Sequence, residues 1–355
     1  MRAVQAGRSY FVTACQLHMV PELLTFDPPD LPPQLRAQRV LNKARVPQIA
    51  RYLVGNPKSY VLSAITASID ADVRFEAESA LQDGVRVGQL VIPAEARILV
   101  NDGQHRRAAI TEALKTAPEL ANESVPLVLF LDAGLLRSQQ IFADLNRHGI
   151  RPNTSLNVLY DHRDKVAELA RHVATNVCPF DGLTELEKSS LSNRASCMFT
   201  LSAIHQATTA LLRSSGLQDQ LDADDERLVV EFWETIGEMI CGWGFIGDGR
   251  TAADLRRDYI HVHAVVLHAL GVVGGELIAR RPRRWRSDLR KLAEVDWSRS
   301  NPTWDGRAIQ NGRISKAGPS LILTANVLRN QTGLPLSLTE RQLEATLPEE
   351  NRVAA

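Results

Sequence analysis

The densest chemical signal in this sequence is the pentapeptide Asp102-Gly103-Gln104-His105-Arg106. It stands between an apolar run that predicts a strand over 98–101 and a pattern that predicts a helix after it. A turn that leads from a strand into a helix exposes backbone N–H groups at the positive end of the helix dipole, where anions bind. Gly103 would let a ligand approach the backbone, and His105 and Arg106 would donate to phosphate oxygens. The turn therefore predicts a phosphate site, although an Asp N-cap followed by surface arginines explains the same residues.

Asp102 is the unexpected member of this turn, because a carboxylate repels a bound anion unless something lies between them. A Mg²⁺ ion or an attacking water would resolve that conflict, which makes Asp102 a candidate catalytic residue. The chain has no G-x-x-x-x-G-K-[ST] loop. This interpretation allows a nucleoside triphosphate with Mg²⁺ as a cofactor. Such a nucleotide would have to bind at the turn. Arg107, the next residue, is a further candidate for contacting the phosphate.

A second candidate segment, Asp144-Leu145-Asn146-Arg147, ends a helix that the pattern predicts over about 135–147. On a helix, Gln140, Asp144 and Arg147 fall on one face at i, i+4, i+7 spacing. The same arrangement is typical of an Asp–Arg surface pair at a helix end, so the segment alone does not distinguish a site from a solvated surface.

The strongest concentration of charge lies between residues 280 and 291. Seven of these twelve residues are basic, namely Arg280, Arg281, Arg283, Arg284, Arg286, Arg290 and Lys291, and we call them the basic cluster. Contacts to DNA phosphates need only such a patch, so the cluster predicts a DNA-binding surface, with a solvated helix start as the alternative. Trp285 would either stack on a base or anchor the segment to the core. No helix-turn-helix is legible, so sequence-specific readout is not predicted.

Taken in order, these segments resemble the DndB family of DGQHR-domain proteins, which belong to bacterial DNA phosphorothioation systems. The resemblance rests on the 102–106 turn, on residues 38–53 and 64–69 before it, and on residues 137–147 after it. The turn is also similar to the Gly-x-x-Arg turn of the ParB/sulfiredoxin superfamily, which holds nucleotide phosphates. The resemblance implies an α+β fold, with a ParB/sulfiredoxin-like N-terminal domain and a mainly helical C-terminal domain. It also implies binding to double-stranded DNA and control of transcription of the modification genes.

The resemblance further implies roles for single residues. Arg39 is the natural candidate to close over the bound anion, with a solvated helix arginine as the alternative. Sulfiredoxin has a catalytic Cys where this chain has Gln104, so Gln104 retains hydrogen bonding to an anion or water but no thiol chemistry. A similar pair of segments occurs in nucleotide-hydrolysing modules of phage-defence proteins. In that comparison Asp144 or Asn146 would orient a metal ion or water, and Arg147 would offset phosphate charge. A DNA-stimulated nucleoside triphosphatase is therefore the alternative function.

The chain is long enough for two domains. As far as residue 150, predicted strands (10–14, 60–65, 89–92, 98–101 and 125–131) alternate with predicted helices. These helices cover 35–53, with an interruption near Pro47, then the stretch from the turn to about 117, and 135–147. From about 153 to 280 the periodicity is helical without a convincing strand, and it predicts helices over 157–175, 193–213, 224–242 and 252–279. Residues 192–194 offer a cap for the second of these. We therefore predict an N-terminal domain over 1–155, a helical domain over 156–345 and a flexible tail over 346–355.

Composition excludes several classes of protein. The 41 basic and 41 acidic residues cancel, so any DNA contact must come from a local patch. The four cysteines, Cys15, Cys178, Cys197 and Cys241, form no C-x-x-C pair. They argue against a disulfide scaffold and a local zinc site, and they favour a reducing cytoplasm. The apolar stretch 259–279 is too polar for a membrane span and predicts a buried helix or helix pair.

Three histidines within that stretch do not predict a metal site. His261 and His268 would share a helical face but stand about 10 Å apart, too far to bind one ion. Buried, hydrogen-bonded histidines are therefore the expectation, and no metal ligand is predicted. The sequence is compatible with two further kinds of partner, namely other copies of this chain in a homo-oligomer and other phosphorothioation proteins.

Overall fold

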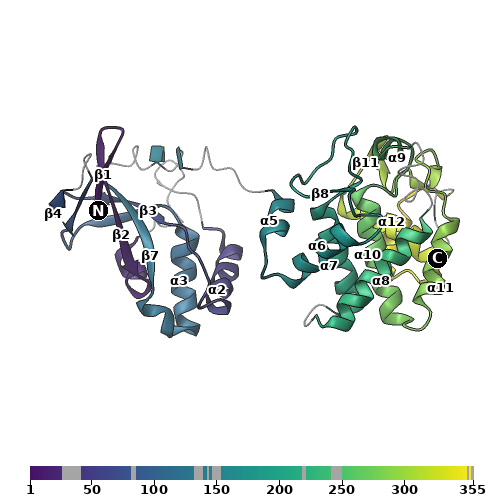
Figure 1. Cartoon of the computed structure of the whole chain (residues 1–355), viewed down its shortest axis with the longest axis horizontal. Helices are drawn as coiled ribbons and strands as arrows, with labels where there is room; N and C mark the ends of the chain where they lie inside the picture. The colour runs from purple at the N-terminus through teal and green to yellow at the C-terminus, as the bar shows by residue number, and fades with distance from the viewer. Residues whose placement is uncertain are drawn as a thin grey trace. The chain divides into compact units, whose positions relative to one another are not determined.

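A computed structural model of the chain describes residues 1–25, 41–80, 85–131, 139–141, 144–145, 153–217, 221–240, 250–349 and 352. The chain divides into two compact units, Met1–Ile150 and Arg151–Ala355 (Figure 1). The first unit mixes a sheet with helices and the second is mainly helical, which confirms the α+β fold class. No helix within the described ranges is long and apolar enough to cross a membrane.

The N-terminal unit is built on a seven-stranded sheet in the order β4-β5-β1-β2-β7-β3-β6. The strands are β1 (Arg2–Gln5), β2 (Arg8–Gln16), β3 (Ile65–Asp70), β4 (Arg74–Ala80), β5 (Arg86–Val91), β6 (Arg97–Asp102) and β7 (Ser124–Leu131). β3 pairs in parallel with β7 and antiparallel with β6. The helices α1 (Val20–Leu23), α2 (Val46–Gly55) and α3 (Gln104–Thr116) belong to the same unit. Of these, α2 and α3 lie side by side (Figure 1).

Burial explains why the strand before the turn is firmly held. In β7 alternate residues, Val125, Leu127 and Leu129, are buried, as expected for a strand with one face on the core. β3 is buried at every position from Ile65 to Ile69, so its neighbour β6 pairs with a strand that is packed on both faces. α3 then packs Ala109, Ile110 and Ala113 onto this core. The β6–α3 turn is therefore set by packing on both of its sides.

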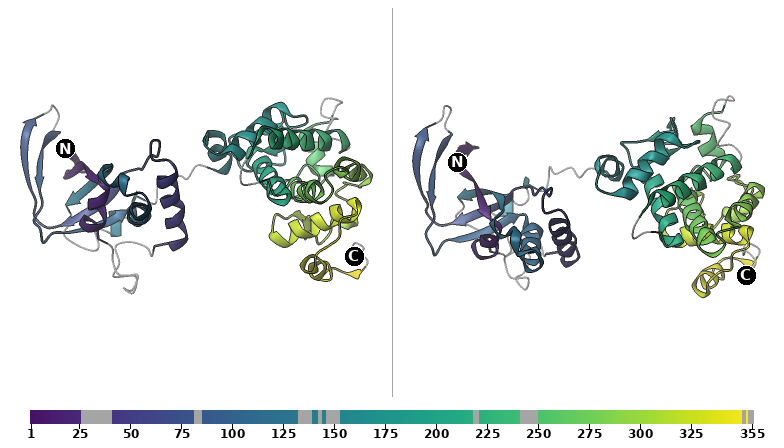
Figure 2. Two further views of the ribbon diagram at one scale, coloured as in Figure 1. Left: turned by 90° about the horizontal axis from the view of Figure 1, so that it is seen from below. Right: turned by 60° about the horizontal axis from the view of Figure 1, so that its bottom comes forward.

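The C-terminal unit is a helical assembly around one central helix. The helices are α5 (Thr154–Tyr160), α6 (Lys165–Asn176), α7 (Leu201–Ser215), α8 (Ala223–Met239), α9 (Ala252–Asp258), α10 (Ala264–Arg280), α11 (Trp285–Leu289), α12 (Gly318–Thr332) and α13 (Leu338–Glu344). Two short ladders join β8 (Thr184–Glu185) to β9 (Phe199–Thr200) and β10 (Ile309–Gln310) to β11 (Arg313–Ile314). α10 is buried along most of its length and contacts α7, α11 and α12 (Figures 1 and 2).

Glycines let α7 and α10 approach each other closely. A Cβ on Gly271 would fall on the backbone carbonyl oxygen of Ala207, and one on Gly275 would fall on that of Leu211. A Cβ on Gly274 would enter the ring of Phe232 on α8. These glycines therefore serve close helix packing rather than helix propensity, which they lower.

Several predicted elements agree with the structure, namely the strands over 10–14, 89–92, 98–101 and 125–131 and the helix that ends near residue 117. The strand predicted over 60–65 is wrong, because β3 begins only at Ile65. The stretch before it is a loop held by side chains: the Val61 N–H donates to the Tyr52 hydroxyl at 2.9 Å, and Tyr60 donates to Glu123. Val61 is 77% exposed, so its apolar character does not mark a buried strand.

Three predicted helix boundaries are also wrong. The helix predicted over 193–213 begins at Leu201, because Thr200 rather than 192–194 is its N-cap and accepts from the Ala203 N–H. The helix predicted over 157–175 is divided into α5 and α6 by Asp164, which caps α6. The helix predicted over 252–279 is divided into α9 and α10, with a bridge from Tyr259 to Ser298 between them. β8 and β9 are strands where none was expected.

The close α7–α10 contact leads to a stability prediction. We expect Gly271→Ala to destabilise the protein by about 1–3 kcal/mol, because overpacking outweighs the helix propensity that alanine gains. Gly318→Ala is the matched control, since Gly318 begins α12 and a Cβ there meets nothing within 4 Å. Urea unfolding of both variants checks this, and equal stability of the two would contradict the close approach.

Candidate functional site

The turn between β6 and α3 requires a glycine. Gly103 is the N-cap of α3 and has a φ of +102°, a conformation that other residues rarely adopt. A Cβ at this position would lie 3.1 Å from both the Arg106 guanidinium and the Ile65 side chain. As a glycine, this N-cap residue has no side chain of its own with which to cap α3. The turn therefore brings the start of α3 and a guanidinium together against the first residue of β3.

Asp102 and Arg106 form an ion pair within this turn. Arg106 Nη2 lies 2.7 Å from Asp102 Oδ2, and Arg106 Nη1 donates to the hydroxyl of Ser63. The Arg106 side chain is 16% exposed, whereas the Asp102 side chain is 45% exposed. The charge of Asp102, which in the sequence argument called for a metal ion or water, is thus offset by Arg106 of the same turn. A bound anion would compete with Asp102 for this guanidinium.

The remaining residues of the turn are held by the fold. Gln104 is buried, and the Asn42 N–H donates to His105 Nε2 at 3.0 Å. Arg107 Nε and Nη2 donate to the carbonyls of Leu24 (3.1 Å) and Pro21 (2.6 Å), and burial lowers the pKa of Arg107. These bonds attach α3 to α1 and the residue after it, and the phosphate contact predicted for Arg107 stays a prediction.

Sequence reasoning missed two polar residues beneath the turn. Asn101 is fully buried, and its Oδ1 accepts from the Ser68 hydroxyl at 2.7 Å. Asn101 Nδ2 is buried, and no residue that the structure describes is its hydrogen-bond partner. An Asn in an apolar strand directly before Asp102 was the available signal, but it was interpreted only as the end of that strand.

The second candidate segment is described only in part. Asp144 accepts from Gln140 Nε2 at 2.7 Å, in agreement with the predicted helical spacing of these two residues. Within the described part of the chain, no hydrogen bond or ion pair joins Asp144 to the 102–106 turn. Arg39, Asn146 and Arg147 lie outside the described residues, as does Cys241. The roles assigned to them stay predictions.

The basic cluster contains three cations with acidic partners. Arg281 and Lys291 bind the buried Asp288 at 2.9 and 3.0 Å, and Arg286 pairs with Glu231. Arg281 also donates to the carbonyls of Thr332 and Gly333 after α12. These cations tie α11 to its neighbours, so they serve the fold as well as the surface.

Four arginines of the basic cluster have no acidic partner. They lie exposed and make no ion pair or side-chain hydrogen bond with any described residue: Arg280, Arg283, Arg284 and Arg290. Two carboxylates, Asp288 and Glu231, pair with cations of the cluster. Five of its seven positive charges are therefore not neutralised by a carboxylate of the described residues. In a chain of zero net charge this is a strong local field.

Trp285 anchors the cluster and is not available to a base. It is 2% exposed, its ring centroid lies 6.3 Å from that of Phe232, and the Arg286 guanidinium lies 4.4 Å above its ring. The DNA-stacking role considered for Trp285 is therefore wrong, because the fold covers the ring, and the anchoring role is the correct one.

Of the histidines between α9 and α10, His261 is fully buried and His263 is half-buried. Burial is the main cause that lowers the pKa of His261 to about 3 and that of His263 to about 4. His261 stacks on Tyr259 with the ring centroids 5.1 Å apart. Among the described residues, no group of three or more His, Cys, Asp or Glu could hold a metal ion.

Comparison with protein families identifies a match over nearly the whole chain. The model of the DndB family, described as DNA-sulfur modification-associated, matches residues 1–335 of the 355. No curated protein and no solved structure matches the chain significantly. The match spans both units, so it includes the 102–106 turn and the basic cluster.

The anchoring role of Trp285 leads to a second stability prediction. We expect Trp285→Ala to lower the free energy of unfolding by about 3–5 kcal/mol, the usual cost of removing a large buried ring. Arg284→Ala, at the adjacent exposed position, is expected to change it by less than about 0.5 kcal/mol. Denaturant unfolding measures both, and a Trp285→Ala variant of unchanged stability would show that the ring is not part of the core.

Proposed function

The chain belongs to the DndB family of DNA-sulfur modification-associated proteins, and on that premise we propose that it binds double-stranded DNA through the basic cluster. The observation that carries the proposal is the set of four exposed arginines without acidic partners, at Arg280, Arg283, Arg284 and Arg290. Arginine suits phosphate oxygens because its planar guanidinium forms two parallel hydrogen bonds.

The arrangement of the cluster supports contact with the DNA backbone rather than with bases. Arg280 ends α10, while Arg283 and Arg284 precede α11, a helix of only five residues. A helix this short is poorly suited to recognising bases in the major groove, which normally receives a longer recognition helix. Contacts of this kind fix the position of a protein on DNA without carrying sequence information.

Control of transcription of the modification genes is the use of DNA binding that we propose, and family membership supports it. The expected partners are DNA and other proteins of the same sulfur-modification system. Preference for DNA taken from upstream of those genes over unrelated DNA of equal length would support this role. Equal affinity for both would contradict it and leave non-specific DNA binding alone.

The basic cluster can be tested directly. We expect simultaneous Arg→Gln substitution at 280, 283, 284 and 290 to weaken binding to all DNA sequences alike. The slope of log affinity against log salt should fall by up to about 0.9 for each DNA phosphate that the variant no longer neutralises. Gel shifts across a range of salt concentrations measure both quantities.

A matched control separates the cluster from general electrostatics. Neutralising four exposed cations of the N-terminal unit changes the net charge equally and should leave DNA affinity nearly unchanged: Arg8, Lys58, Arg74 and Lys115. If both quadruple variants lose affinity equally, or if neither does, the DNA surface lies elsewhere.

The alternative function, nucleotide hydrolysis at the 102–106 turn, has one favouring observation. An ion pair between Asp102 and Arg106 stands at the start of α3, whose N-cap Gly103 has no side chain, so a phosphate could accept from the guanidinium while Asp102 turns to a water or Mg²⁺. This is a rearrangement of existing partners rather than a preformed active site.

The alternative predicts two separable losses. Asp102→Ala should abolish phosphate release from a nucleoside triphosphate with Mg²⁺ and DNA, while Arg106→Ala should weaken binding at the turn by about 1.5–3 kcal/mol. Asp70→Ala, which removes an exposed carboxylate at the end of β3, is the control. Absence of phosphate release by the unaltered protein, with Mg²⁺ or Mn²⁺ and with DNA, would eliminate the hydrolase.

A further inference from the structure

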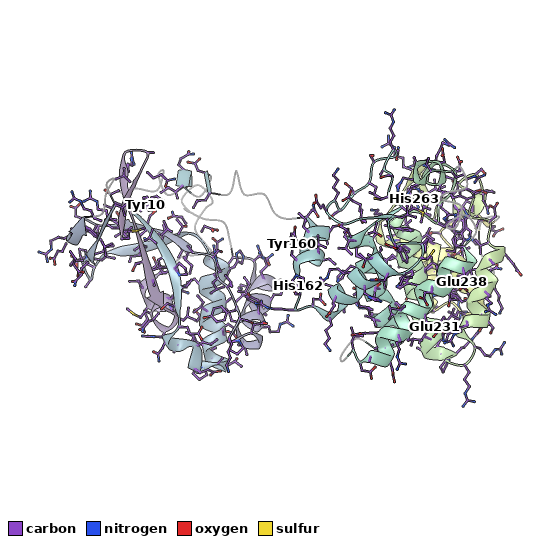
Figure 3. All side chains as sticks on the ribbon, viewed as in Figure 1. Tyr10, Tyr160, His162, Glu231, Glu238 and His263 are labelled. Atoms are coloured by element: carbon purple, nitrogen blue, oxygen red, sulfur yellow. The ribbon has the colours of Figure 1, made fainter. Side chains whose placement is uncertain are left out.

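A cationic hollow of about 430 Å³ lies inside the helical unit. Four segments of the chain line it: residues 189–193, the end of β9 with the start of α7, the stretch from α9 to α10, and residues 299–316 around β11. A volume of this size falls in the usual range for small-molecule sites, about 300–1,000 Å³. Figure 3 shows His263, which lines the hollow, and Glu231, which pairs with the basic cluster, at separate places on this unit.

The charges around the hollow have one sign. Its cations are Arg256, Arg299, Arg313 and Lys316, and none of the described residues that line it carries a carboxylate. Neutral hydrogen-bonding groups accompany them, namely Ser189, Ser190, Asn193 and Thr200. Cations gathered without carboxylates repel each other, so the arrangement gains stability when an anion enters.

Arg256 gives the most direct evidence for an anion. It is only 5% exposed, and its Nη2 donates to the carbonyls of Cys197 (2.6 Å) and Met198 (3.0 Å). Its Nε is buried without a hydrogen-bond partner among the described residues. Burial lowers the pKa of this guanidinium. A buried cation with an unused donor and no carboxylate partner is costly in a folded protein, and a bound anion would satisfy both needs.

Two helix starts add to this field. α7, of 15 residues, begins beside Thr200, and α10, of 17 residues, begins beside His263, where no side chain caps it. Thr200, Ala203, His263 and Ala264 all line the hollow. Partial positive charge at these helix ends favours an anion. Their convergence follows from the close α7–α10 packing, which fixes the two helices against each other.

Apolar side chains line the remaining wall. They include Leu191, Val262 and Ile314, together with the buried Phe199. An inorganic ion would leave these groups without a partner, whereas a base or sugar would cover them. The wall therefore favours a ligand that joins an organic part to its anionic group.

We propose that this hollow binds a small organic phosphate of nucleotide size. The phosphate lies among Arg256, Arg313 and Lys316, and the organic part lies along the apolar wall. The site differs from the 102–106 turn, which belongs to the N-terminal unit, and it does not depend on the basic cluster.

Calorimetric titration of the full-length protein with AMP, inorganic phosphate and adenosine tests the proposal. We expect AMP to bind more tightly than phosphate, and adenosine to bind at least tenfold more weakly than AMP. The double variant Arg313→Gln/Lys316→Gln should weaken AMP and phosphate by at least tenfold and leave adenosine unchanged. Both side chains are exposed, so the double variant is expected to fold normally.

Two control variants locate the binding. The quadruple variant of the basic cluster and the quadruple variant of the N-terminal unit, at Arg8, Lys58, Arg74 and Lys115, should both bind AMP as the unaltered protein does. Arg256→Gln should also weaken AMP, and comparison of its thermal unfolding with that of the unaltered protein identifies any loss that comes from misfolding.

Two results would overturn the proposal. The first is the absence of AMP binding at millimolar concentration, and loss of DNA affinity in the double variant would then make the hollow part of a DNA surface. The second is equal AMP affinity in the double variant and the unaltered protein.

Discussion

The backbone of α10 lies against the backbone of α7 at Gly271 and Gly275, where no side chain separates the two helices. This contact fixes the positions of the charged groups at both ends of α10. It holds the starts of both helices beside the buried Arg256, and it fixes the helix whose last residue, Arg280, opens the basic cluster. A larger residue at Gly271 would displace one helix from the other and change the hollow, even though Gly271 itself does not line it.

Zero net charge conceals a strong separation of charge within the helical unit. Arg281, Arg286 and Lys291 are committed to carboxylates, whereas Arg280, Arg283, Arg284 and Arg290 have none among the described residues. A second hollow, lined by Glu168, Glu226, Glu231 and Glu234 with Arg227 and His172, has the opposite character. Because Glu231 lines this hollow and also pairs with Arg286, the acidic surface lies directly beside the basic cluster. DNA would therefore meet attraction on one side and repulsion on the other, which restricts how it can lie.

Sequence patterns predicted the elements whose burial is periodic and failed where side chains define a loop. β6 and β7 were predictable because their apolar residues are buried at alternating or consecutive positions, β2 because its apolar run includes the buried Phe11, and α3 because it follows the Gly103 turn. Thr200 as the cap of α7 was not, since a cap is recognised only when the helix start is known. For the site, the sequence located the turn and the basic cluster, but not the Asp102–Arg106 pair or the burial of Trp285. The cationic hollow was out of reach, because its cations are spread over residues 256–316 and meet only through the fold.

α10 connects the two proposed binding regions of the helical unit. Its first turn borders the hollow and its last residue belongs to the basic cluster, and 17 residues of helix span about 25 Å. A ligand in the hollow and DNA on the cluster would therefore act on opposite ends of one rigid, largely buried element. Any effect of the ligand on DNA affinity must have an equal counterpart in the effect of DNA on ligand affinity. For a family associated with DNA modification, this geometry gives a physical route by which a small phosphate could alter DNA binding without touching the DNA.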